Sequence, residues 1–157
     1  MGLSRPTIRL LARALAPKRR SGAVVTFGKS GIEGQYEQIR EILIQEGITP
    51  AALEAAQIEH DSLTQFGRSL HQDTLFRMLG FSVVHSLDYF DAEQPTFQVD
   101  LNQPIPDTLR GRYDLLMDAG TTEHCFDVRQ VLVNAVAVLK PALAAATCAC
   151  SATPFSS

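Results

Sequence analysis

The sequence lacks the features that identify several whole classes of protein. It has no tryptophan, only three cysteines among 157 residues, and no apolar run that approaches the ~18 residues needed to cross a bilayer. An odd number of cysteines gives no complete disulfide framework, so a reduced, intracellular protein is expected, with the cytoplasm as its compartment. The length suits one domain better than two.

Acidic residues are absent from the first 20 positions, which hold six basic ones. The rest of the chain has 8 basic against 17 acidic residues, a net charge of −9. Such an acidic body is poorly suited to a phosphate backbone, so no nucleic-acid partner is expected.

The basic N-terminal stretch "RPTIRLLARALAPKRR" predicts an amphipathic helix within residues 1–21, with Ile8, Leu11, Ala12 and Leu15 on one side. An organelle transit peptide or a surface-binding helix would have the same pattern. We favour a short helix that packs on the domain.

Two phosphate-binding motifs are also missing. "GAVVTFGKSGIEG" predicts a strand, Ala23 to Phe27, that runs into glycines at 28, 31 and 34. The P-loop needs a glycine five positions before Gly28, and Gly22 lies one position too far away. The spacing of the three glycines also fails the dinucleotide pattern G-x-G-x-x-G. A strand that enters a glycine-rich turn still marks a place where doubly wound folds admit a ligand.

Residues 35–80 have a helical pattern. "YEQIREILIQEG" predicts a helix that stops at Gly47, Thr49-Pro50 predicts the start of a second, and "DTLFRMLG" predicts a third that ends at Gly80. His60 and His71 fall in this region without a third ligand at a suitable spacing, so no metal site is predicted.

After Gly80 the pattern predicts three strands, and each delivers an aspartate at its carboxyl end. "FSVVHSLD" ends in Asp88, "TFQVD" in Asp100 and "YDLLMD" in Asp118. In an open α/β sheet, the carboxyl ends of the strands line the crevice where ligands bind. The three carboxylates are therefore expected to meet at one edge of the sheet.

The order of these strands, followed by "YDLLMDAGTTEHCFDVRQVLVNAVAVLKP", resembles the class I S-adenosylmethionine-dependent methyltransferases. Similarity extends over about residues 22–141 and depends most on Tyr113-Asp114-Leu115, Glu123-His124 and Leu139-Lys140-Pro141. The resemblance implies a Rossmann-like α/β fold with an open, mainly parallel sheet, a helical insert at about 35–80, and the first four strands in the order 3-2-1-4.

The same resemblance implies roles for individual residues in binding S-adenosylmethionine. Asp88 would hold the ribose diol, Asp100 would receive the adenine amino group, and the backbone N–H of Leu101 would face a ring nitrogen. Gly28 would let the backbone approach the methionine part, and Asp118 to Gly120 would form the floor of the pocket.

Glu123 and His124 are the candidate catalytic base residues, because histidine titrates near neutral pH. The alternative, which we favour, is that Glu123 starts the helix and His124 packs against the sheet. Cys125 is interpreted as a packing residue.

Two departures from the family pattern are visible. The glycine-rich first motif appears only as "TFGKSGIEG". After Pro141 the chain has "ALAAATCACSATPFSS" instead of a further strand, so residues 142–157 are expected to be an irregular tail or the product of a shifted reading frame. Strands five to seven are then missing, and the exposed edge of "YDLLM" is expected to promote self-association.

The sequence thus predicts methyl transfer to an unidentified acceptor, a small molecule more readily than a macromolecule, with turnover impaired by the loss of half the sheet. Two alternatives stay open. One is a non-catalytic module that binds the cofactor, and the other is an interaction protein that docks a partner through residues 35–80.

Overall fold

The structure, a computed structural model, describes residues 2–15, 22–49, 63–64, 67–68 and 70–141. The chain divides into two units, one made of residues 1–22 and 30–84 and the other of residues 23–29 and 85–157. Every predicted site residue belongs to the second unit.

The described part of the first unit contains helices α1, α2 and α4 and two short strand pairs. Strand β1 pairs in parallel with β3, and β4 pairs antiparallel with β5. The elements are β1 (Gly2–Leu3), α1 (Arg5–Leu15), β3 (Gly31–Ile32), α2 (Tyr36–Gln45), β4 (Leu63–Thr64), β5 (Gly67–Arg68) and α4 (Gln72–Met78).

Helix α1 confirms the amphipathic pattern of the basic N-terminus. Its residues Ile8, Leu11 and Ala12 are buried and Leu15 is partly buried, and the helix packs against α2. The apolar side of this helix is therefore used inside the first unit.

The predicted ends of two helices are confirmed as well. Helix α2 stops just before Gly47, which has a φ of +94°, and α4 ends shortly before Gly80. His71 is the N-cap of α4 and accepts a hydrogen bond from the backbone N–H of Asp73. The helix predicted from Thr49-Pro50 and the residue His60 fall largely outside the described residues.

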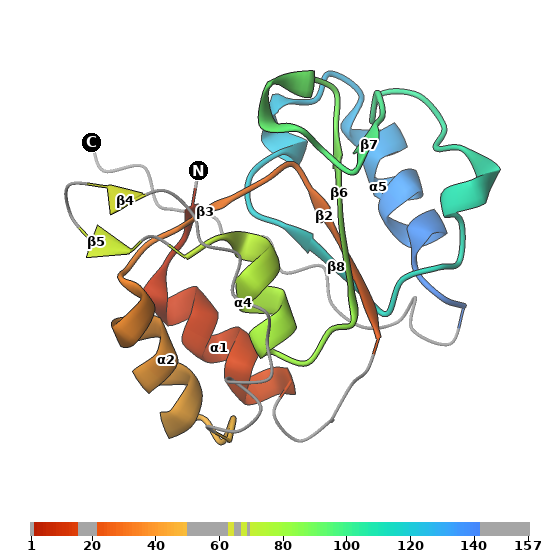
Figure 1. Ribbon diagram of the computed structural model, residues 1–157. Coiled ribbons are helices and arrows are strands. Elements are labelled where there is room, and N and C mark those ends of the chain that lie inside the picture. Colours follow the sequence, from red (N-terminus) through yellow and green to blue (C-terminus); the bar gives the residue numbers. More distant parts are fainter. Residues whose placement is uncertain (1, 16–21, 50–62, 65–66, 69, 142–157) are drawn as a thin grey trace, which may run out of the picture. The chain divides into compact units, whose positions relative to one another are not determined.

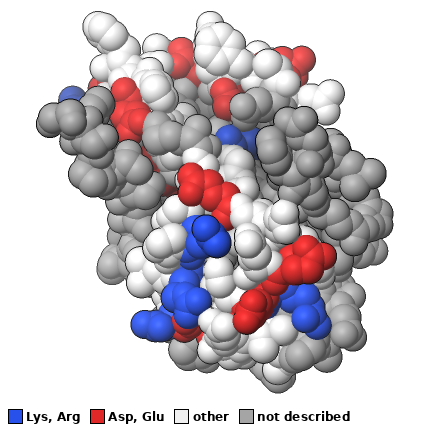
Figure 2. Space-filling model, turned by 90° about the vertical axis from the view of Figure 1, so that its left-hand side faces the viewer, with Lys and Arg blue, Asp and Glu red and all other residues white. Residues whose placement is uncertain are grey.

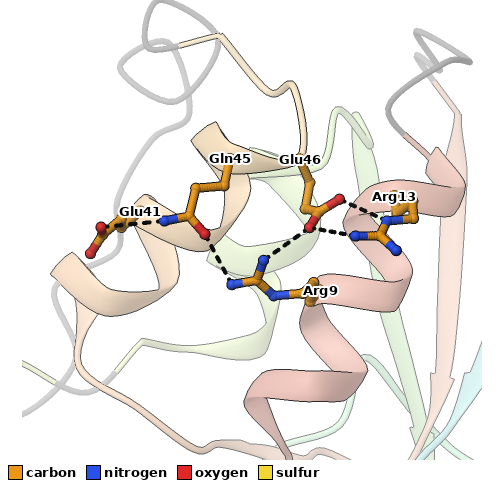
Figure 3. A network of polar contacts seen from close by, with 5 residues as sticks. All are labelled: Arg9, Arg13, Glu41, Gln45 and Glu46. Atoms are coloured by element: carbon orange, nitrogen blue, oxygen red, sulfur yellow. Dashed lines mark hydrogen bonds and ion pairs between the residues drawn. The ribbon is translucent and has the colours of Figure 1, made fainter.

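Glu46, directly after α2, joins that helix to α1 (Figure 3). It accepts hydrogen bonds from Arg9 at 3.1 Å and from Arg13 at 2.9 and 3.1 Å. Gln45 extends the network, because it accepts from Arg9 and donates to Glu41. The Glu46 side chain is only 9% exposed, so the two arginines enclose it.

The basic charge of α1 is thus met by acidic charge from α2. On the face shown in Figure 2, acidic and basic side chains lie among one another instead of forming separate fields. The hydrogen bond from Arg13 is the largest cause that lowers the pKa of Glu46, and the charges of Arg13 and Arg9 act in the same direction.

Replacing Glu46 by glutamine is expected to destabilise the first unit at pH 7 but not in acid. A carboxylate with a lowered pKa contributes stability that is present above its ordinary pKa of 4.5 and is lost as the pH falls through the lower, folded value. The denaturation midpoints of Glu46→Gln and wild type, followed by circular dichroism, should therefore converge below that range. Glu41→Gln, which removes a carboxylate that accepts from Gln45 and has no ion pair with a described residue, is the control and should change little. A difference that is independent of pH would show that the charge of Glu46 is not the cause.

The second unit is built on an open four-stranded sheet. Its strands lie side by side in the order β7, β6, β2, β8 (Figure 1), which confirms the predicted order 3-2-1-4 and the α/β class with a mainly parallel sheet. The β2–β8 and β6–β7 pairs are parallel, with Val24 opposite Leu115 and Leu87 opposite Phe97. The strands are β2 (Ala23–Phe27), β6 (Val83–Asp88), β7 (Phe97–Gln98) and β8 (Leu115–Asp118).

The strand predicted from Phe81 begins two residues later, at Val83. Phe81 instead packs on the end of α4, because its N–H donates to the carbonyl of Phe76 and the two rings meet edge to face. The predicted bounds of β2 are those observed.

Helix α5 (Val128–Val138) covers the sheet, and three 3-10 turns (Asp91–Glu93, Asp107–Leu109 and Thr122–His124) connect the elements. The core joins Val131 and Val138 of α5 to residues of the sheet such as Phe27 and Leu116. The opposite side of α5 exposes apolar residues, namely Leu132, Val133 and Val136.

Asp114 joins the start of β2 to the start of β8. It accepts hydrogen bonds from the backbone N–H of Ala23 at 2.9 Å and from the Lys140 ammonium group at 2.8 Å. Lys140 also donates its backbone N–H to the carbonyl of Tyr113, and Leu139 forms a parallel bridge with Tyr113. The motif letters at both ends of this stretch therefore have a structural role.

No helix in the described ranges is long and apolar enough to cross a membrane.

Candidate functional site

The candidate site lies where β2, β6 and β8 end. Gly28 follows β2 with a φ of +69°, and its N–H donates to the carbonyl of Leu87 at 2.8 Å. A Cβ atom on Gly28 would stand 2.5 Å from Oγ1 of Thr121 and 3.5 Å from Oδ2 of Asp88. Only glycine permits this approach of three chain segments.

Asp88 ends β6 and keeps part of its carboxylate available. Oδ1 accepts the N–H of Phe90 at 3.0 Å, whereas Oδ2, directed toward Gly28, has no polar partner among the residues that the structure describes. The side chain is partly buried. A carboxylate in this state can still accept hydrogen bonds from hydroxyl groups.

Asp100 has a similar arrangement after β7. Its Oδ1 accepts two hydrogen bonds from Asn102, from the backbone N–H at 2.9 Å and from the side-chain amide at 2.8 Å. Within the described chain, Oδ2 has no recorded partner. Leu101, which carries the neighbouring backbone N–H, has a buried side chain.

Asp118 is different, because both of its oxygens are used by the turn that it begins. Oδ1 accepts the N–H groups of Gly120 and Thr121 at 3.0 and 2.8 Å, and Oδ2 accepts the N–H and the hydroxyl of Thr122. The residue is 5% exposed. Asp118 and Gly120 therefore shape the turn, and the carboxylate has little capacity left for a ligand.

Thr121 has a role that was not predicted from the sequence. Its hydroxyl donates to the carbonyl of Phe27 at 2.7 Å and so ties the turn after β8 to the end of β2. A threonine after a glycine is too common to be singled out, and only the parallel pairing of β2 with β8 reveals this contact.

Glu123 and His124 lie in the 3-10 turn Thr122–His124, with side chains 54% and 74% exposed. Their side chains approach each other at 3.8 Å, which gives an ion pair only when the histidine is protonated. Helix α5 begins at Val128 with Asp127 as its N-cap. The expectation that Glu123 starts the helix is wrong, because Asp127 supplies the capping oxygen. The expectation that His124 packs against the sheet is wrong as well, because its side chain is 74% exposed.

Cys125 follows the turn Thr122–His124 and is partly buried. Burial raises the pKa of its thiol, and the negative charges of Asp118, Asp100 and Asp88 raise it further. Asp88, Asp100 and Asp118 end or follow β6, β7 and β8, which belong to one mainly parallel sheet, so the three carboxylates lie at the same edge of that sheet. We call Asp88, Asp100 and Asp118 the carboxylate cluster. The raised pKa also fits a packing role for Cys125, since the thiolate is disfavoured.

Removing one charge of the carboxylate cluster is expected to make Cys125 more reactive. In a Cys148→Ser, Cys150→Ser background, Asp100→Asn should lower the thiol pKa and give a severalfold faster reaction with iodoacetamide at pH 7. The difference should vanish at high pH, where both thiols are ionised. Asp107→Asn, whose native side chain is 97% exposed, is the matched control. Equal rates for Asp100→Asn and wild type at pH 7 would contradict the convergence.

The ligand chemistry of the carboxylate cluster favours cations and hydroxyl or amino donors over phosphate. Among the described residues, no three His, Cys, Asp or Glu side chains are placed to hold a metal ion. Two hollows elsewhere, of about 660 Å³ beside α1 and α2 and about 730 Å³ on the outer side of α5, do not include the cluster.

Comparison with protein-family models, with characterised proteins and with solved structures gives no match for this chain. The functional inference therefore rests on the arrangement of the carboxylate cluster and Gly28.

Proposed function

We propose that the second unit binds S-adenosylmethionine and serves methyl transfer to a small-molecule acceptor. The observation that supports this most is that Gly28, Asp88 and Asp100 end or follow three strands of one sheet, and that Oδ2 of each aspartate has no hydrogen-bond partner among the described residues. Carboxyl ends of such strands are where open α/β sheets bind ligands.

The donors and acceptors fit the adenosyl group. Asp88 would accept hydrogen bonds from the ribose hydroxyls, and Oδ2 of Asp100 would accept from the adenine amino group. The backbone N–H of Leu101 would donate to a ring nitrogen. Gly28 would let the main chain lie close to the methionine part, and the negative charge of the carboxylate cluster complements a cationic sulfonium.

When bound, the cofactor supplies a methyl group already activated by the sulfonium. The protein then has to align the acceptor and exclude competing nucleophiles. If the acceptor carries a proton, Glu123 and His124 are the candidates to remove it, and their exposed position would require the acceptor to lie over the turn Thr122–His124.

That exposure also favours a second candidate function, a module that binds the cofactor without catalysis. Among the described residues, no hydrogen bond or ion pair joins the side chain of Glu123 or His124 to the carboxylate cluster. Saturable cofactor binding without methyl transfer to any tested acceptor would support this alternative.

We place the protein in the cytoplasm, because its cysteines offer no disulfide framework. Self-association through the edge of β8 is part of the proposal, since β8 pairs only with β2 among the described strands. Light scattering over a concentration series would test it.

Calorimetric titration with S-adenosylhomocysteine tests the function. Wild type should bind saturably, and Asp88→Ala should bind at least about tenfold more weakly because two charge-assisted hydrogen bonds are lost. Asp107→Ala, an exposed aspartate outside the carboxylate cluster, should bind as wild type does. No binding by a wild-type chain shown to be folded would reject the proposal. If substitutions at Asp88 and Asp100 do not change the binding of S-adenosylhomocysteine, an interaction protein that docks a partner through residues 35–80 becomes the better hypothesis.

A further inference from the structure

Asn134 is a polar residue on the buried side of α5. It is 1% exposed and lies between Val131 and Val138 on that side. A buried amide is costly unless all of its hydrogen-bonding groups are satisfied, so an apolar residue would be the ordinary choice here. Its presence calls for a specific set of partners.

Those partners belong mainly to the loop that follows Asp100. The amide nitrogen of Asn134 donates to the carbonyls of Leu101 at 2.9 Å and Gln103 at 2.8 Å. The amide oxygen accepts from the backbone N–H of Ile105 at 3.2 Å and from the side chain of Gln130 at 3.0 Å. Both donors and both acceptor positions of Asn134 are thus used.

One peptide group links Asn134 to Asp100. The carbonyl of Leu101 is held by Asn134, and the N–H of the same peptide group, that of Asn102, donates to Oδ1 of Asp100. The orientation of this peptide therefore fixes the direction of the Asp100 carboxylate. Asn102 is held from a second side, because its side-chain oxygen accepts the N–H of Asp127 at the start of α5.

We infer that Asn134 is a positioning residue that sets the preference for adenine through Asp100 and Leu101, an inference that rests on the proposed function. Adenine offers an amino donor and an adjacent ring acceptor, which match a carboxylate oxygen and a backbone N–H. Hypoxanthine offers the opposite pair, a carbonyl acceptor and a ring N–H donor. Discrimination between the two depends on how firmly the acceptor and the donor of the protein are held.

The test compares S-adenosylhomocysteine with S-inosylhomocysteine on the full chain. Asn134→Asp keeps the size of the side chain but replaces two donors by acceptors that face carbonyls. The ratio of the two affinities should fall by about tenfold or more relative to wild type, the effect of about one misplaced hydrogen bond. Asp88→Asn should weaken both ligands equally and leave the ratio unchanged. Val131→Ala, which removes packing from the same buried side of α5, should also leave the ratio unchanged.

Amide hydrogen exchange supplies a readout that needs no ligand. In Asn134→Asp, the N–H groups of Asn102 and Ile105 should exchange faster while those of β2 stay protected. In Val131→Ala, exchange at the N–H groups of Asn102 and Ile105 should not be faster than at the other N–H groups near this side of α5. Unchanged exchange, or an unchanged affinity ratio in a variant that still binds S-adenosylhomocysteine, would overturn the role of Asn134 and leave the proposed function standing. A folded wild type that binds neither ligand would overturn both.

Discussion

Replacing Asp118 by alanine is expected to lower the free energy of unfolding of the second unit by about 2–4 kcal/mol. The Asp118 carboxylate is almost fully buried and accepts hydrogen bonds from three consecutive backbone N–H groups and one hydroxyl. Alanine would leave those donors without a partner at a position where water has little access. Denaturation in urea, followed by circular dichroism, measures the change.

Two further substitutions separate this effect from the loss of charge alone. Asp118→Asn keeps one acceptor oxygen and should cost less than Asp118→Ala. Asp107→Ala removes an aspartate whose side chain is 97% exposed and which pairs with Arg110, so it should cost less than about 0.5 kcal/mol. If Asp118→Ala proved as mild as Asp107→Ala, the turn after β8 would not depend on its carboxylate.

The substitution Gly28→Ala is expected to destabilise the second unit by at least about 2 kcal/mol and to abolish binding of S-adenosylhomocysteine. A residue with a side chain is strained at a φ of +69°, and the added Cβ would lie 2.5 Å from the hydroxyl of Thr121. Gly31→Ala is the matched control, because a Cβ there meets nothing within 4 Å. The measurements are urea denaturation and calorimetric titration.

A double-mutant cycle distinguishes the two causes. In a Thr121→Ala background the hydroxyl is gone, so Gly28→Ala should cost less than it does in wild type. The part that persists is the strain of the backbone. An identical cost in both backgrounds would mean that the approach of Thr121 to Gly28 is not what requires glycine.

The strands themselves were predictable because the signals that define them are local. Strand β2 is a β-branched run between glycines, and "YDLLMD" and "FSVVHSLD" are apolar runs that end in an acid, so each is recognisable without its neighbours. Their order in the sheet came from the resemblance to methyltransferases. The convergence of Asp88, Asp100 and Asp118 follows from the parallel arrangement once that order is known.

Other parts of the site depend on contacts between distant segments and could not be predicted. Thr121 matters because its hydroxyl reaches Phe27, which is 94 positions away in the sequence. Asn134 looked like one polar position in an apolar helix, and its partners at 101 to 105 are defined only by the packing of α5. The start of α5 was predicted too early, because Glu123 and Asp127 are equally acceptable acids near a helix N-terminus. Only the turn made by Asp118 decides between them.

The ion pair between Asp114 and Lys140 has a consequence for how the loss of an enzyme's activity during evolution can be recognised. Asp114 accepts a hydrogen bond from the first residue of β2, and Lys140 donates one to Asp114, so both contacts stabilise the sheet whether or not a reaction takes place on it. A protein lineage that has lost its activity but still folds would keep Asp114 and Lys140 while the residues of its ligand-binding crevice were substituted. The same letters carry much of the resemblance to methyltransferases, so a descendant without turnover would go on looking like an enzyme. Its ancestry would be visible in the residues that stabilise the sheet, and its present activity would depend only on the residues at the carboxyl ends of the strands.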